Sequence, residues 1–212
     1  MTSARQRRLQ RARRTGVVLT IVLVASAGIV TTGALRGGPP AAAVAVCPGA
    51  RTTASPPDTD VAAADIAPGA LPATLMAQPT RLDLVPVFRQ WASTCAIPVA
   101  LLEATCWWES GWQQNEVSAT GAVGVCQIEP GAAQTVRGLL GDGTLDPRTA
   151  SDNIEISAAY LRWLLDETGG RQDLTLAGYY QGLTSLRRYG VLAVSRPYVA
   201  GITALLHDYS WS

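Results

Sequence analysis

The chain has 212 residues, and all 17 of its basic residues are arginine. The absence of lysine from the sequence excludes P-loop nucleotide chemistry, Schiff-base catalysis and pyridoxal attachment, and a single histidine, His207, excludes an HExxH zinc site. Beyond residue 36 there are 10 Arg against 16 Asp and Glu, a balance of −6, so nucleic acid is not an expected ligand. We expect no metal and no cofactor, and the remaining chemistry is that of carboxylates.

The N-terminus has the pattern of an export sequence. Residues 1–15 are rich in arginine and residues 16–35 carry no charge, which predicts a basic cytoplasmic segment followed by a signal sequence or transmembrane anchor. Ala25-Ser26-Ala27 offers a cleavage site, whereas the full run to Leu35 is long enough to span a bilayer. Both alternatives stay open, and an uncleaved segment would make the membrane a partner.

Residues 36–82 differ from the rest of the chain in composition. They hold eight of the 13 prolines and no aromatic residue. Such a segment cannot bury enough apolar surface to offset its ordering entropy, so we predict an extended linker. The folded domain is then expected over residues 83–212, which contain all six Trp and all six Tyr.

The folded part has the helix start and stop residues that are typical of a helical domain. Apolar spacing together with Pro and Gly positions predicts helices over 83–93, 98–111, 130–141 and 152–168, with shorter ones near 173–181, 183–189 and 196–207. Gly121 and Gly124 indicate tight turns or a short hairpin within 112–128. The predicted fold is a compact, mostly α domain with a small irregular or β-hairpin element.

Four cysteines in an exported chain predict two disulfides, with three possible pairings. We favour Cys106 with Cys126 and Cys47 with Cys95. Both bridges would be structural, the first joining a helix to the glycine-rich stretch and the second joining the linker to the domain.

Glu109 is the strongest candidate for catalysis from the residues alone. It falls in the last predicted turn of its helix, where the macrodipole disfavours a carboxylate, and Trp107, Trp108 and Trp112 flank it. Both effects are expected to raise its pKa, and a carboxylic acid protonated near neutral pH can donate to the leaving oxygen of a glycosidic bond. The alternative is an exposed glutamate at a helix end.

The surrounding motif resembles the lytic transglycosylase catalytic domain of the goose-type lysozyme superfamily. Its elements are Glu109-Ser110-Gly111, then Ser118, then GAVGVCQIEP over residues 121–130. Later landmarks stand in order, and the resemblance covers roughly residues 83–207: Asp146-Pro147, Asn153-Ile154, Tyr160-Leu161, Ala177–Gly182 and Tyr198-Val199. Two positions depart from the pattern, because Tyr180 replaces the usual Asn and Glu129 replaces a residue that is often Met.

The resemblance implies an α+β lysozyme-like fold and a role for each motif residue. Glu109 would act first as acid and then as base on peptidoglycan glycan strands, while the substrate's own C6 hydroxyl attacks, which leaves a 1,6-anhydro-N-acetylmuramic acid end. Ser118 and Gln127 would bind sugar groups, Tyr179 would form a hydrogen bond near Glu109 and orient it, and Glu129 would lie in the sugar-binding groove. The enzyme would be a monomer, exported to face the cell wall or secreted.

Two other functions remain in view. A lysozyme-like muramidase on the same fold would need a second carboxylate, for which Glu129 is the best candidate, since Glu103, Glu116 and Glu155 are interpreted as solvated charges. A non-catalytic glycan-binding or assembly module is the alternative of another class, and the intact Glu109-Ser110-Gly111 argues against it. Ser110 is expected to cap backbone groups at the helix end, and Trp108 and Trp112 to stack on sugars or pack in the core.

Overall fold

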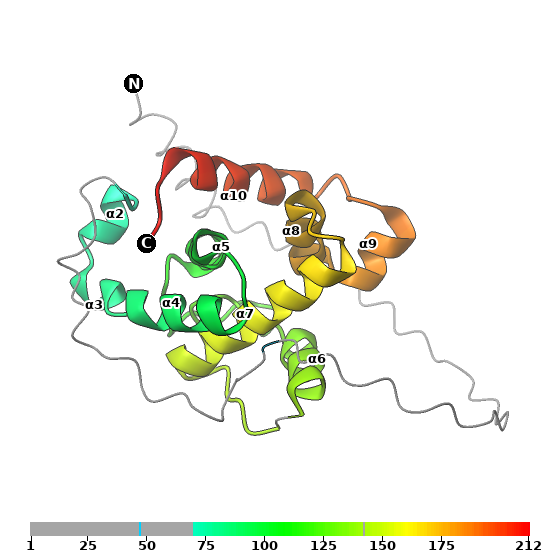
Figure 1. Ribbon diagram of the computed structural model, residues 1–212, viewed down its shortest axis with the longest axis horizontal. Coiled ribbons are helices and arrows are strands. Elements are labelled where there is room, and N and C mark those ends of the chain that lie inside the picture. Colours follow the sequence, from blue (N-terminus) through cyan, green and yellow to red (C-terminus); the bar gives the residue numbers. More distant parts are fainter. Residues whose placement is uncertain (1–46, 48–69, 142) are drawn as a thin grey trace, which may run out of the picture. The chain divides into compact units, whose positions relative to one another are not determined.

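The computed structural model describes Cys47 and residues 70–141 and 143–212, which belong to one compact unit. The predicted basic segment and export helix, and most of the predicted linker, lie outside the described residues. Figure 1 shows the helices in chain order: α2 (Ala73–Met76), α3 (Pro79–Leu82), α4 (Val85–Thr94), α5 (Val99–Ser110), α6 (Pro130–Leu140), α7 (Ala150–Glu167), α8 (Gln172–Gln181), α9 (Leu183–Tyr189) and α10 (Arg196–Asp208). In this part of the chain, no helix combines the length and the apolar character that crossing a membrane requires.

The helices from α4 onward lie where the sequence places them, which confirms the mostly α fold class. Proline and glycine residues at the helix ends explain the agreement. Helix α5 follows Pro98 and ends at Gly111, which takes the left-handed conformation with φ 69°. Helix α6 begins at Pro130 and ends at Gly141 in the same way, with φ 66°.

The predicted hairpin region contains no regular strand. In the described residues between α5 and α6, the chain forms two isolated antiparallel bridges, Val117 with Val123 and Val123 with Ile128. Gly124 turns the chain with φ +79°, and a Cβ there would lie 2.4 Å from the Asn153 side-chain nitrogen. Glycine is therefore required at 124 both by the backbone angle and by the close approach of Asn153.

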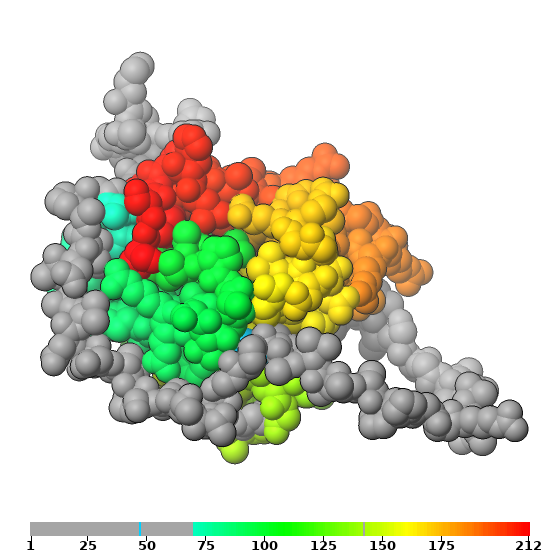
Figure 2. All heavy atoms as spheres, viewed as in Figure 1, coloured from blue at the N-terminus to red at the C-terminus, as the bar shows by residue number. Residues whose placement is uncertain are grey.

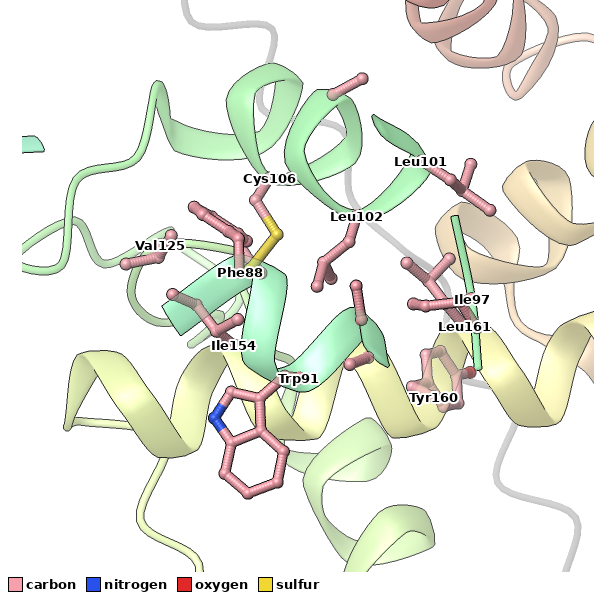
Figure 3. Close-up of a cluster of buried hydrophobic side chains, with 14 of the residues drawn as sticks. Phe88, Trp91, Ile97, Leu101, Leu102, Cys106, Val125, Ile154, Tyr160 and Leu161 are labelled. Carbon is pink, nitrogen blue, oxygen red and sulfur yellow. A yellow bond between two sulfur atoms is a disulfide. The ribbon is translucent and has the colours of Figure 1, made fainter. Parts of the chain in front are cut away.

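Helix α5 is the centre of the domain. Figure 1 shows it almost end-on, and α4, α7 and α10 pack against it. Its first nine residues are apolar except Glu103 and Thr105, which suits a helix buried on most of its circumference. Figure 3 shows side chains from α4, α5 and α7 in the shared core: Phe88, Trp91, Leu101, Leu102, Cys106, Ile154 and Leu161.

The folded domain begins earlier than the sequence predicts. Residues 73–82, assigned to the linker, form α2 and α3, and Leu71, Leu75 and Leu82 are buried. The predicted boundary at residue 82 is therefore too late. Arg81 of α3 also donates hydrogen bonds to Gly111 O at 3.0 Å and to Gln113 Oε1 at 3.2 Å. Composition missed this segment because its contribution to the core comes from a few leucines among many prolines and alanines.

Both favoured disulfides are present. Cys106 on α5 is bonded to Cys126 in the glycine-rich stretch, and Cys47 is bonded to Cys95 directly after α4. Figure 3 shows the first bond beside Phe88 and Val125. Each closes a loop of the unfolded chain and thereby lowers its entropy. The pairing confirms that one bridge joins the helix of Glu109 to the following turn.

Candidate active site

The C-terminal end of α5 is fixed by the residues that follow Glu109. Ser110 accepts a hydrogen bond from Gln113 N at 2.8 Å and donates one to Val125 O at 2.7 Å. The Ser110 side chain is buried and binds backbone groups of the segment that follows α5, not the free carbonyl groups of the helix itself. Glu109 therefore stands on the last turn of a helix whose end is tied to the turn after it.

A tyrosine from the other end of the domain orients Glu109. The Tyr198 hydroxyl, on the first turn of α10, donates a hydrogen bond of 2.6 Å to Glu109 Oε1. The Trp108 ring meets the Tyr198 ring edge to face, with centroids 6.4 Å apart. A Cβ at Gly201 would lie 2.1 Å from the Trp108 ring, so only glycine lets α10 approach this indole. The contact between α5 and α10 thus sets the carboxyl group in place.

The Glu109 carboxylate affects the pKa of three tyrosines near it. Burial and, after it, the Glu109 carboxylate raise the pKa of Tyr179, Tyr180 and Tyr198. Raised values keep all three hydroxyls protonated, so they stay available as hydrogen-bond donors. Helices α8 and α10 therefore place neutral donors around the end of α5.

Tyr179 does not take the orienting role predicted for it. Its hydroxyl donates to Cys126 O at 3.0 Å and lies 3.0 Å from Ser157 Oγ. The hydroxyl bound to Glu109 is that of Tyr198, which the sequence supplies only as a late landmark. A contact between positions 89 residues apart leaves no periodic signal, so spacing alone could not find it. Tyr179 instead joins α8 to the turn that carries Gln127.

That turn is held by Asn153 of α7. Its side-chain amide donates to Val123 O at 2.9 Å and Pro147 O at 2.7 Å, and its oxygen accepts from Cys126 N at 2.8 Å. Gln127 has φ +48°, and its amide nitrogen donates to Gly124 O at 3.1 Å and to Glu116 O at 3.2 Å. Gln127 is therefore braced by the backbone of its own turn.

Ser118 and Glu129 belong to one hydrogen-bonded chain. Ser118 Oγ accepts from Ala122 N at 3.0 Å and lies 2.9 Å from the Thr120 hydroxyl, which donates to Glu129 Oε1 at 2.6 Å. Thr120 is exposed, and Ser118 and Glu129 are half-buried. The structure thus brings two of the predicted sugar-binding residues together through Thr120.

Two other glutamates differ from their predicted state. Glu103 is fully buried, and Glu155 is 3% exposed, so neither is a solvated charge. Burial raises the Glu103 pKa to about 7, against the lowering effects of Ser212 and Arg89. Ser212 donates to both Glu103 oxygens. The correction arises because α5 is buried on the Glu103 face as well, where the C-terminal segment covers it.

Of the three tryptophans near Glu109, two are buried in the core and one, Trp108, contacts the tyrosine that is bound to Glu109. Trp112 is 1% exposed, packs on Phe88 at 4.5 Å between ring centroids, and donates to Glu103 O at 3.0 Å. It belongs to the core, which is one of the two alternatives that the sequence left open. Trp107 is buried as well, whereas Trp108 is half-buried and contacts Tyr198.

The helical architecture is that of lytic transglycosylases. The domain is similar to the 70-kDa soluble lytic transglycosylase of Escherichia coli, with 22% identity and a TM-score of 0.54 over 63% of this chain and 26% of that one. The 70-kDa soluble lytic transglycosylase in complex with bulgecin A gives 21% identity, a TM-score of 0.54 and the same coverage. The lytic transglycosylase Slt of Pseudomonas aeruginosa, solved as an inactive Glu-to-Gln mutant, gives 20% identity and a TM-score of 0.52 over 57% of this chain and 22% of that one.

Residues 86–197 match the Transglycosylase SLT domain model, so the chain belongs to that family. The match runs from α4 to the first turn of α10. It ends one residue before Tyr198, whose hydroxyl reaches Glu109. The chain spans about a quarter of the length of the solved structures named above.

Proposed function

We propose that this protein is a peptidoglycan lytic transglycosylase that cleaves the β-1,4 bond between N-acetylmuramic acid and N-acetylglucosamine. The observation that carries the proposal is the position of Glu109, at the end of α5 in an SLT domain, with a phenol hydroxyl 2.6 Å from its carboxyl oxygen. A hydrogen bond of this length fixes the direction of the carboxyl group, which general acid catalysis requires. Peptidoglycan glycan strands are thus the proposed partner.

In the proposed mechanism one carboxyl group serves twice. Protonated Glu109 gives its proton to the glycosidic oxygen as the bond from that oxygen to C1 of N-acetylmuramic acid breaks. The C6 hydroxyl oxygen of the same sugar then bonds to C1, and its proton returns to Glu109. The enzyme ends in its starting state, the product is a 1,6-anhydro sugar, and neither water nor a second carboxylate takes part.

The surrounding residues fit this division of work. Tyr198 holds the carboxyl group of Glu109 by a hydrogen bond. The phenols of Tyr179 and Tyr180 are neutral, so they place no further charge beside Glu109 as it loses and regains its proton. Ser118 and Gln127 are the proposed sugar-binding residues, each set by hydrogen bonds within the turn that they share. The Pseudomonas aeruginosa enzyme is inactive as a Glu-to-Gln mutant, and the proposal assigns a glutamate of the same importance, Glu109, to this chain.

The proposed location is outside the cytoplasm, either anchored in the membrane through residues 16–35 or secreted. Two disulfides within the described part of the chain support it, because such bonds form and persist in oxidising compartments. The arginine-rich N-terminus before an uncharged run agrees with this location.

The test is the chemical identity of the product. Purified sacculi are digested with the protein, and the released fragments are analysed by mass spectrometry before and after borohydride reduction. A lytic transglycosylase yields fragments lighter by one water than hydrolysis products, and these do not react with borohydride. Reducible N-acetylmuramic acid ends as the main product would identify a muramidase, and binding to sacculi with no release of fragments would identify a non-catalytic module.

A further inference from the structure

Tyr180 differs from the other tyrosines near Glu109 in how its side chain is used. The Tyr179 hydroxyl is bound to Cys126 O and Ser157, and the Tyr198 hydroxyl is bound to Glu109. The hydroxyl of Tyr180 has no hydrogen-bond partner among residues 70–141 and 143–212, and the side chain is half-buried. Tyr180 is thus an aromatic residue at the site whose polar end the described part of the fold does not use.

The Tyr180 ring is nevertheless held in a defined position. It packs on the Tyr198 ring, with centroids 4.8 Å apart and a tilt of 33° between the planes. Tyr198 in turn meets Trp108, so three rings from α8, α10 and α5 form a row. Aromatic pairs at such distances stabilise the fold by more than the burial of their surface area alone accounts for. The row fixes the Tyr180 ring without burying it fully.

Tyr180 also lies within the electrostatic reach of the proposed acid. Burial is the larger cause that raises the pKa of Tyr180, and the Glu109 carboxylate raises this pKa further. Figure 2 shows the helices that carry these rings meeting on one face, with the atoms of α8 (yellow) against those of α10 (red). A sugar placed at Glu109 would therefore have the Tyr180 ring beside it.

The chemistry of a pyranose matches such a residue. One face of the ring presents a set of apolar C–H groups, which pack on a flat aromatic surface, and the hydroxyl groups at its edge accept from a phenol. An aromatic ring also contributes contact area at low conformational-entropy cost, because it has few rotatable bonds. At position 180 the usual motif residue of this fold, Asn, could donate a hydrogen bond but could not supply a flat apolar face.

We propose that Tyr180 is a sugar-binding residue of this site, which packs its ring on a pyranose ring of the glycan next to Glu109 and donates a hydrogen bond from its hydroxyl to that sugar. This inference rests on the proposed function. It makes Tyr180 a determinant of glycan affinity, while Tyr198 acts on the carboxyl group.

The experiment measures binding separately from turnover. In a Glu109→Gln background, the Kd for a chitooligosaccharide of N-acetylglucosamine is measured by calorimetry, with Tyr180 intact and with Tyr180→Leu, Tyr180→Asn and Tyr180→Phe. We expect Leu and Asn to weaken binding about tenfold, which corresponds to about 1.4 kcal/mol, and Phe to weaken it about threefold. Leu keeps apolar volume without a flat face, and Phe keeps the face without the hydroxyl, so the series separates the two contributions.

Tyr189→Ala is the matched control. Tyr189 at the end of α9 is 62% exposed, and the Arg188 guanidinium lies 5.1 Å from its ring centre. Its loss is expected to leave the Kd unchanged. An equal loss of affinity in the Tyr189 and Tyr180 variants, or none in either, would overturn the inference.

Turnover with Glu109 intact distinguishes binding from positioning. For Tyr180→Leu and Tyr180→Asn we expect KM on sacculi to rise about tenfold while kcat changes by less than about twofold. A fall in kcat at constant KM would overturn the inference, because it would mean that Tyr180 only supports Tyr198 and Glu109. If the wild-type protein cleaves sacculi but the Tyr180 variants match it, this inference alone fails. If the wild-type protein neither binds the oligosaccharide nor cleaves sacculi, the proposed function fails.

Discussion

Two glutamates on α5, Glu103 and Glu109, have the same side chain but different surroundings. Glu103 is fully buried, and its carboxylate accepts hydrogen bonds from Ser212. Glu109, on the last turn, accepts a hydrogen bond from Tyr198 and stands near Tyr179 and Tyr180. One lies where the C-terminal segment covers the helix, and the other lies where α8 and α10 bring phenols to its end.

The comparison teaches that a raised pKa does not by itself mark a catalytic acid. Burial raises the pKa of Glu103 to about 7, the range in which a general acid works, yet both of its oxygens are engaged by the covering segment. Ser210 N and Trp211 N in that segment donate to Ala70 O, so Glu103 helps to join the chain's last residues to the core. Glu103 is a structural group, and the chemistry is proposed at Glu109.

The largest expected effect separates the two glutamates by activity. Glu109→Gln keeps the shape of the side chain but removes the transferable proton, so the rate of sacculus digestion should fall by about a hundredfold to ten-thousandfold. The melting temperature should stay close to that of the wild type. Glu103→Gln is the matched control on the same helix and should retain most of the activity. Near wild-type digestion by the Glu109 variant would contradict the assignment.

The second effect separates them by stability. Because the folded-state pKa of Glu103, about 7, lies above its ordinary value of 4.5, the folded protein keeps a proton between these pH values that the unfolded chain has released. Its contribution to the free energy of unfolding is therefore complete below about pH 4.5 and is lost as the pH rises to about 7, a change of about 3 kcal/mol.

Glu103→Gln removes this titration, so the variant isolates the contribution. Urea unfolding of both proteins between pH 4 and pH 8 gives the difference in stability at each pH. The wild type should lose stability relative to the variant as the pH rises through this range. A difference that does not change with pH would show that Glu103 has an ordinary pKa in the folded protein.

The third effect compares the tyrosines. Tyr198→Phe removes the donor to Glu109, and because hydrogen bonds to charged groups contribute about 1.5–3 kcal/mol, kcat should fall about tenfold or more with KM little changed. Tyr179→Phe removes the hydrogen bond to Cys126 O in the turn that carries Gln127, together with the contact to Ser157 of α7, and should act on KM and stability instead. Steady-state kinetics with a soluble glycan fragment measure both. Equal loss of kcat in the two variants would refute the division of roles.

The sequence predicts the helices well because local signals define them. Pro98 and Gly111 bound α5, and Pro130 and Gly141 bound α6, so each helix has a start and an end that short-range chemistry sets. The motif also places Glu109 at a helix end. Four cysteines allow three pairings, and the favoured one, Cys106 with Cys126 and Cys47 with Cys95, is the one that the structure contains.

The errors concern contacts between distant parts of the chain. Tyr198 reaches Glu109 across 89 positions, and Ser212 reaches Glu103 across 109. Neither contact leaves a periodic pattern in the sequence. The family resemblance therefore implies Tyr179, and not Tyr198, as the orienting residue, and nothing in the sequence shows that Glu103 is covered by the C-terminal segment. The same reason applies to α2 and α3, whose packing on the core depends on tertiary contacts rather than on their proline-rich composition.

The smallest expected effect is at Glu129, and it decides whether the site needs a second carboxylate. Glu129 is a glutamate like Glu109, but the Thr120 hydroxyl donates a hydrogen bond to it, and Thr120 is in turn linked to Ser118. A glutamine at 129 can accept the same hydrogen bond from Thr120, so Glu129→Gln should preserve the arrangement of this chain. Because the proposed mechanism uses no second carboxylate, activity should stay within about threefold of wild type, and the 1,6-anhydro product should still dominate. Mass spectrometry of fragments from the two proteins measures product and rate together. Reducible ends from the wild type, with a loss of a hundredfold or more in the variant, would instead make Glu129 the base that activates water, as general base catalysis is commonly of about that size.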